Sequence, residues 1–164
     1  MDHLWAPWRL AYITKEAPPQ DGDECFICRA IAESDDRRNL VIQRGRHGAV
    51  LLNRFPYNNG HLLVAPKAHK GRLDELTGDE SLELQQTLNR MVQVLEATMR
   101  PEGFNIGLNL GKVAGAGLPG HVHWHVVPRW NGDTNFMPIF ADVKVISQSL
   151  DALYDLLSNA LNSP

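Results

Sequence analysis

Short runs of mostly apolar residues, bounded by polar turns, recur along the first two thirds of the chain. They span residues 40–43, 49–53, 61–65 and 104–108. Runs of this length with turn residues on both sides are typical of β-strands. Because only a few residues separate the first three runs, we expect these three to pair as neighbouring antiparallel strands.

Two other stretches have the longer period of a helix. In residues 79–100 the apolar positions are three or four residues apart: Leu84, Leu88, Met91, Leu95 and Met99. They form one stripe of an amphipathic helix, which Thr77 or Asp79 is expected to cap and Pro101 to end. A C-terminal helix is predicted by a second stripe: Leu150, Leu153, Leu157 and Leu161.

Smaller elements lie between these. We expect a short helix at residues 29–33, a polar turn at 34–38 and a short strand at 143–146. At 164 residues the chain fits one domain. Residues 1–23, with two tryptophans and several prolines, predict an extended arm that packs either on the domain's own surface or on a second subunit.

Residues 120–128 combine the strand pattern with a cluster of histidines at alternate positions: His121, His123 and His125. Side chains of a strand alternate between its two faces, so the three imidazoles are expected on one face. The apolar residues beside them are expected to face the core: Val122, Trp124 and Val126. Pro128 is expected to end the strand because it has no N–H. A lone histidine would favour an ordinary solvent-facing position, but three favour a chemical site.

The net charge limits the classes of partner that we expect the protein to bind. A formal net charge of −3 gives no basic footprint for a nucleic acid polymer, whereas a small phosphorylated ligand needs only local positive groups. We see neither a run of about 18 apolar residues, as a membrane span needs, nor the layout of a secretion signal. We therefore expect no membrane contact and a cytoplasmic location.

The two cysteines, Cys25 and Cys28, form a CxxC pair. A structural disulfide is disfavoured because the cytoplasm keeps thiols reduced. A thioredoxin-like redox motif would follow a strand in a βαβ unit, and no strand is predicted before Cys25. The pair is better interpreted as half of a zinc site, which histidines would complete to four ligands.

The segment from Asn109 to Gly120 is rich in glycine and leads directly into His121. Glycines let backbone N–H groups approach a ligand closely, and concave groups of N–H donors favour anions. This loop therefore predicts an anion site beside the histidines.

At this point the sequence resembles the histidine-triad (HIT) family, whose signature is His-x-His-x-His followed by two apolar residues. Residues 121–127 match it in full, and the likeness covers about residues 24–130. Other positions follow the family's pattern: Leu52, Asn53, Pro56, Gly60, His61, Pro66, His69, Asn109, Gly111, Ala114 and Gly115. Residues 5–9 and 128–136 resemble a bacterial branch that acts on dinucleoside polyphosphates such as diadenosine tetraphosphate.

The resemblance implies an α+β fold, a homodimer, and a division into an arm (1–23), a core (24–130) and a C-terminal extension (131–164). It also implies an enzyme that transfers a nucleotidyl group through a histidine. The ligand would be a purine nucleotide or a dinucleoside polyphosphate.

The family's roles carry over to several residues here. His123 would attack the α-phosphorus as the nucleophile, beside His121 and His125. Further donors to the phosphate would come from the loop: Asn109, Gly115, Ala116 and Gly117. Asn53 would bind a ribose hydroxyl, although a turn residue that caps the strand end is an equal alternative.

For the metal, the resemblance implies a closed structural zinc site with four ligands: Cys25, Cys28, His69 and His121. If His121 instead orders the triad, His47 or His61 would complete the site.

One departure leaves the acceptor open between water and phosphate. Many relatives place Gln, Ser or Thr in the loop before the triad, where this chain has Ala116, Gly117 and Pro119. Three alternatives to the main hypothesis also stay open. They are a nucleoside phosphoramidate hydrolase, a nucleotide-binding regulator without turnover, and a metal hydrolase whose nearest downstream carboxylate is Asp133.

Overall fold

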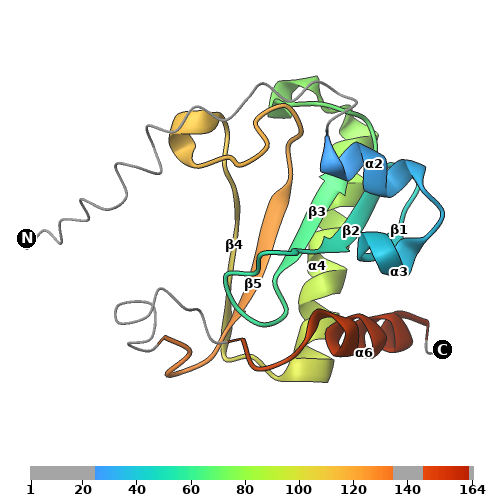
Figure 1. Cartoon of the computed structure of the whole chain (residues 1–164). Coiled ribbons are helices and arrows are strands. Elements are labelled where there is room, and N and C mark those ends of the chain that lie inside the picture. The colour runs from blue at the N-terminus through green and yellow to red at the C-terminus, as the bar shows by residue number, and fades with distance from the viewer. Residues whose placement is uncertain (1–24, 135–145, 163–164) are drawn as a thin grey trace, which may run out of the picture.

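The computed structural model describes residues 25–134 and 146–162 (Figure 1). The predicted arm at 1–23 and the predicted strand at 143–146, apart from Ile146, lie outside the described residues. None of the helices in the described ranges combines the length and the apolar character that a membrane span requires.

A five-stranded antiparallel sheet forms the centre of the fold, with the strand order β1-β2-β3-β5-β4. The strands are β1 (Val41–Arg44), β2 (Gly48–Leu52), β3 (Leu62–Pro66), β4 (Gly103–Leu108) and β5 (Trp124–Arg129). The four strands predicted before the histidine segment are all present, within one or two residues at each end. The α+β prediction is confirmed.

The helices and 3-10 turns complete the description: α2 (Phe26–Ala32), α3 (Asp36–Asn39), η2 (Leu73–Glu75), α4 (Gly78–Met99), η3 (Lys112–Ala114) and α6 (Leu150–Asn162). The prediction for α4 is confirmed, and its cap is Thr77. The Thr77 hydroxyl accepts from the N–H of Glu80, while the Glu80 carboxylate accepts from the N–H of Thr77. These reciprocal bonds form a capping box.

Two local predictions near the N-terminal end of the described chain differ from the structure, although the predicted short helix is present. The first helix begins at Phe26 rather than Arg29, because the Cys25 sulfur accepts from the N–H of Cys28 and caps it. The polar turn expected at 34–38 contains the start of α3, which Asp35 caps by accepting from the N–H of Arg38.

The strand that carries the histidines also differs from the prediction. It begins at Trp124, so His121 and His123 precede it, and it continues through Pro128 to Arg129. β3 pairs with β5 only as far as Val126, opposite Leu62. Pro128 therefore lies beyond the end of β3, where β5 needs no N–H on that side.

Helices cover the two faces of the sheet unequally. α4 runs along one face with α6 (Figure 1), where it packs on Leu62, Val64 and Val126. α2 lies on the other face, where buried Leu63 and Ala65 belong to separate clusters. α3 lies beside the edge strand β1, and its Arg37 binds Asp155 of α6. Cross-strand partners share a face. His125 is paired with Leu63, so it faces the α2 side.

Candidate active site and metal centre

The ring of His123 is held by the backbone beside it. Its side chain is buried, 8 % exposed, and Nδ1 lies 2.8 Å from the carbonyl oxygen of His121. A carbonyl oxygen only accepts, so Nδ1 must carry the proton and donate it. Burial lowers the pKa of His123 and favours its neutral form. In this neutral tautomer Nε2 holds a free lone pair, which is the state of a nucleophile.

His125 is oriented by His61. The N–H of Tyr57 donates to Nδ1 of His61 at 3.0 Å, so the neutral His61 ring carries its proton on Nε2. That Nε2 lies 2.9 Å from Nδ1 of His125 and donates to it. The second nitrogen of His125 then carries a hydrogen. Burial, with a smaller effect from His123, lowers the pKa of His125 to about 4.

The resulting pair of rings is complementary. His123 and His125 have centroids 5.0 Å apart and meet edge to face. One ring offers a lone pair and its neighbour offers an N–H. This arrangement suits attack on an electrophile whose developing negative charge needs a donor close by.

A second group of side chains lies on the other side of His121. The structure brings together the four predicted ligands, with one ligand atom from each residue and all four within 4.8 Å of one another: Cys25, Cys28, His69 and His121. Nδ1 of His121 is 3.2 Å from the Cys25 sulfur, and Nδ1 of His69 is 3.3 Å from the Cys28 sulfur.

The bonding of His121 fits a metal ligand. Its Nε2 is 2.8 Å from the carbonyl oxygen of Pro66, so Nε2 carries the proton and Nδ1 turns its lone pair toward the sulfurs. Metal-binding histidines commonly donate their other N–H in this way. Burial lowers the pKa of His121 to about 4, which keeps the lone pair free of a proton.

The donor chemistry of the group fits zinc. Burial, followed by the hydrogen bond and charge of Cys25, raises the pKa of Cys28 to about 11. Two adjacent thiolates need a cation between them, and two sulfurs with two imidazoles are a typical zinc set. Neither alternative ligand joins the group. His61 contacts His125, and the backbone N–H of His47 donates to Glu83 at the turn between β1 and β2.

Several hydrogen-bond donors of the glycine-rich loop bind carbonyls within the loop, which the sequence did not predict. The N–H groups of Gly115 and Ala116 donate within the loop, to the carbonyls of Lys112 and Gly111. The Asn109 side-chain amide donates to the Gly115 carbonyl, at 3.4 Å. In contrast, a Cβ at Gly117 would meet nothing within 4 Å, so there is open space at that position.

Asn53 has the bonding expected of a turn residue. It follows β2 directly, and its side-chain oxygen accepts from the N–H of Phe55 at 2.9 Å. Its side-chain nitrogen is 3.2 Å from Nδ1 of His61, which places Asn53 beside the His61 and His125 pair.

Asp133 is fully engaged elsewhere. Its carboxylate binds the guanidinium of Arg129 through both oxygens and also accepts from Asn58 and from the N–H of Trp130. The Arg129 guanidinium is the main cause that lowers the pKa of Asp133 to about 2. A carboxylate bound in this way is a poor base for activating water.

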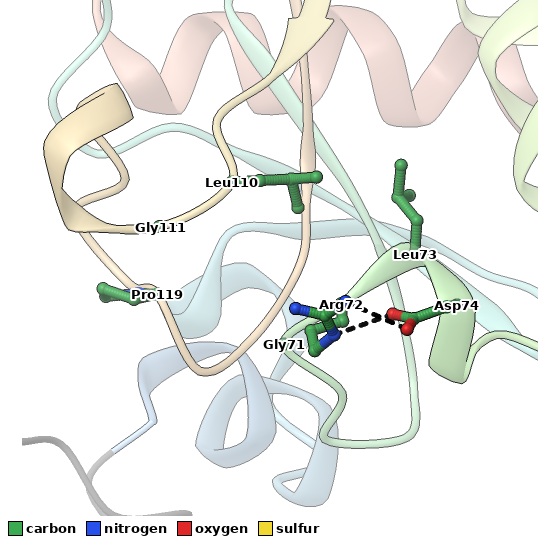
Figure 2. A pocket seen from close by; sticks show the side chains of 7 residues that line it. All are labelled: Gly71, Arg72, Leu73, Asp74, Leu110, Gly111 and Pro119. Atoms are coloured by element: carbon green, nitrogen blue, oxygen red, sulfur yellow. Dashed lines mark hydrogen bonds and ion pairs between the residues drawn. The ribbon is translucent and has the colours of Figure 1, made fainter.

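A cavity of about 510 Å³ borders the glycine-rich loop. It is lined by Gly71, Arg72, Leu73, Asp74, Leu110, Gly111 and Pro119. Figure 2 shows Leu110 extending from the loop toward the side of Leu73, with the ion pair between Arg72 and Asp74 below them. The volume is within the range of small-molecule sites, about 300–1,000 Å³.

His61 is the site residue whose role the sequence did not predict. It was expected only as a spare metal ligand, whereas the structure pairs it with His125. The available signal was its position immediately before β3, the strand that pairs with β5.

The chain is similar in sequence to a known domain family and to named enzymes. The sequence model of the HIT domain matches residues 34–132. AP-4-A phosphorylase of Mycobacterium tuberculosis is 40% identical over 154 residues, which cover 92% of this chain and 79% of that protein. The asymmetrical bis(5'-nucleosyl)-tetraphosphatase of Schizosaccharomyces pombe is 36% identical over 93 residues, 57% of this chain and 50% of that protein.

Solved structures share the fold. A zinc-bound histidine triad family protein from Mycobacterium smegmatis superposes with a TM-score of 0.67 at 24% identity, over 86% of this chain and 95% of that one. A histidine triad nucleotide-binding protein from Sulfolobus tokodaii gives 0.65 at 26% identity, over 84% of this chain and 89% of that one.

Proposed function

The chain belongs to the HIT domain family, and we propose that it is an enzyme that cleaves dinucleoside polyphosphates of the diadenosine tetraphosphate type at the α-phosphate. The curated names of its two enzyme relatives support this substrate class. One observation carries the mechanism: Nδ1 of His123 donates to the His121 carbonyl, which leaves Nε2 as the lone-pair nitrogen.

In the first step Nε2 of His123 attacks the α-phosphorus. A phosphorus–nitrogen bond forms as the bond to the bridging oxygen of the leaving polyphosphate breaks, and that oxygen takes the electron pair. Nδ1 keeps its proton, so the nucleotidyl-imidazole is a cation that the His121 carbonyl stabilises. The product of this step is a nucleotidyl-histidine.

Charge on the phosphoryl oxygens is met by fixed donors. The hydrogen on Nε2 of His125 is one such donor, because His61 occupies the other nitrogen of that ring. From the loop, we assign Asn109, Gly115, Ala116 and Gly117 to the phosphate-binding side of the site. The N–H groups of Gly115 and Ala116 would exchange their bonds to the Lys112 and Gly111 carbonyls for bonds to the phosphate. Gly117, with open space beside it, is the strongest of these assignments.

In the second step an acceptor attacks the same phosphorus and the bond to Nε2 breaks. Water as acceptor makes the protein a hydrolase, and inorganic phosphate makes it a phosphorylase. Asn53 lies beside His61, and we assign it to a ribose hydroxyl of a purine nucleotide. Its oxygen can accept a second hydrogen bond in addition to the one from Phe55.

We assign zinc to Cys25, Cys28, His69 and His121. With four protein ligands the ion would have no open position for water, so it would supply stability rather than chemistry. It would also fix the His121 backbone, whose carbonyl orients His123. The metal hydrolase alternative is disfavoured because Asp133, its expected carboxylate, is bound to Arg129.

The remaining assignments concern assembly and location. We propose a homodimer that pairs through β4, the edge strand on which Ile106 is 47 % exposed and a Cβ at Gly107 would meet nothing within 4 Å. We propose a cytoplasmic location, where Cys25 and Cys28 would stay reduced and able to bind zinc. We propose no nucleic acid polymer and no membrane as partners.

The test is a product analysis. Wild type and His123→Ala are incubated with diadenosine tetraphosphate or a nucleoside phosphoramidate, each with and without inorganic phosphate. We expect the wild type to cleave the tetraphosphate and His123→Ala to be inactive. Faster cleavage of the phosphoramidate than of the tetraphosphate would favour the nucleoside phosphoramidate hydrolase. Binding without products would favour the nucleotide-binding regulator.

A further inference from the structure

The peptide group that joins His121 to Val122 is held at both of its ends. Its carbonyl oxygen accepts from Nδ1 of His123 at 2.8 Å, and its N–H donates to the backbone oxygen of Lys70 at 2.6 Å. A trans peptide is planar, so a fixed direction for the N–H also fixes the direction of the carbonyl. The orientation of the His123 ring therefore depends on where the oxygen of Lys70 lies.

The side chain of Lys70 is fixed by Glu80. Its Nζ lies 2.6 Å from a carboxylate oxygen of Glu80, and the two side chains are only 22 % and 9 % exposed. The same oxygen of Glu80 accepts from the N–H of Thr77, at the first turn of the 22-residue helix α4. Lys70 is thereby attached to one of the longest rigid elements of the fold.

The loop that contains Lys70 has little room to move against the histidine segment. A Cβ at Gly71 would lie 3.0 Å from the carbonyl oxygen of Pro119, and one at Gly120 would lie 3.4 Å from Nε2 of His69. If Lys70 shifts, the peptide between His121 and Val122 should therefore shift with it, because the close packing leaves no room for the loop alone to adjust.

We propose that Lys70 and Glu80 are positioning residues, which orient the imidazole of His123 through the peptide between His121 and Val122. This inference rests on the proposed function, because it concerns the rate at which Nε2 of His123 reacts. An ion pair that only connected α4 to the loop would change stability alone. A positioning pair also changes the rate of the folded protein and the site of the proton on His123.

The experiment compares Lys70→Met and Glu80→Gln with the conservative Lys70→Arg. Thr77→Ala is the matched control, since it removes a cap bond of α4 and leaves the Lys70 and Glu80 pair in place. For each variant, the rate of nucleotidyl-histidine formation in a single turnover, KM, zinc content and melting temperature are measured. Histidine ¹⁵N NMR reports which nitrogen of His123 carries the proton.

We expect the single-turnover rate to fall about 10- to 100-fold in Lys70→Met and Glu80→Gln, since misplacing a reacting group by about 1 Å can cost that much. KM and zinc content should stay close to the wild type, and Lys70→Arg should restore most of the rate. The proton of His123 should stay on Nδ1 in Thr77→Ala and divide between both nitrogens in Lys70→Met.

Three results would overturn the inference. They are unchanged rates in both charge variants, an equal loss in Thr77→Ala, and a loss that simply follows zinc content. A wild type that forms no nucleotidyl-histidine would refute the proposed function instead. In that case an unchanged proton site on His123 in Lys70→Met would refute this inference separately.

Discussion

His61 donates from Nε2 to Nδ1 of His125 across 2.9 Å, and the N–H of Tyr57 sets this direction by donating to the other nitrogen of His61. The backbone N–H of Tyr57 thus determines which ring nitrogen of His125 carries the hydrogen that is offered to the site. Replacing His61 should therefore impair the reaction without touching the nucleophile.

The first prediction concerns His61→Phe, which retains an aromatic ring next to Tyr57 but loses the hydrogen bond to His125. We expect kcat to fall by about 10²–10³-fold if His125 loses its role as a donor, the usual cost of removing one such group. Steady-state kinetics will check this, with His47→Phe as the control outside the site. An unchanged kcat would show that the hydrogen bond from His61 to His125 has no part in the reaction.

The second prediction concerns the metal. Purified protein should contain about one zinc ion per chain, as a closed four-ligand site requires. Cys25→Ala should lower the melting temperature by roughly 4–8 °C for a loss of about 2 kcal/mol in a chain of this size. Metal analysis and thermal unfolding will check both. Adduct formation that stops within seconds of adding a chelator, before unfolding, would contradict a purely structural role.

The third prediction concerns acid stability. Folding lowers the pKa of Asp133 to about 2, mainly through Arg129, from about 3.9 in the unfolded chain. A carboxyl with a lowered pKa stabilises the fold above the unfolded value and loses this effect as the pH falls from about 4 to 2. The melting temperature of the wild type should therefore exceed that of Asp133→Asn at pH 7, and the difference should shrink below pH 4. A constant difference would contradict this assignment.

The fourth prediction concerns the edge strand. Ile106→Lys places a charge on the exposed face of β4, where we propose the second copy to pair. Sedimentation should show a dimer for the wild type and a monomer for the variant. Gln86→Lys, a change at an exposed position on helix α4, should stay dimeric. A wild type that sediments as a monomer at all concentrations would refute the proposed assembly.

Parts of the fold were predictable because the signals are local. The stripe from Leu84 to Met99 and the cap at Thr77 depend only on neighbours in the sequence, and the structure reproduces both. The start of β5 was not predictable in this way. It depends on where β3 stops pairing, and that register also explains why Pro128 lies inside the strand.

The candidate site also combines features that the sequence predicted with contacts that it could not predict. The cluster of Cys25, Cys28, His69 and His121 was predictable because the CxxC pair and the resemblance both pointed to it. The contact between His61 and His125, and the contact between Val122 and Lys70, join segments that are distant in the sequence. Only the strand order brings them together, so no spacing along the chain could reveal them.

The account depends most on covalent bonding at Nε2 of His123. The most direct measurement is mass spectrometry of protein mixed with diadenosine tetraphosphate and quenched in alkali, where a phosphohistidine bond survives. We predict a nucleotidyl group on the peptide that contains His123, and none in His123→Ala. Turnover by the wild type with no trapped adduct, or an adduct on another residue, would contradict the mechanism.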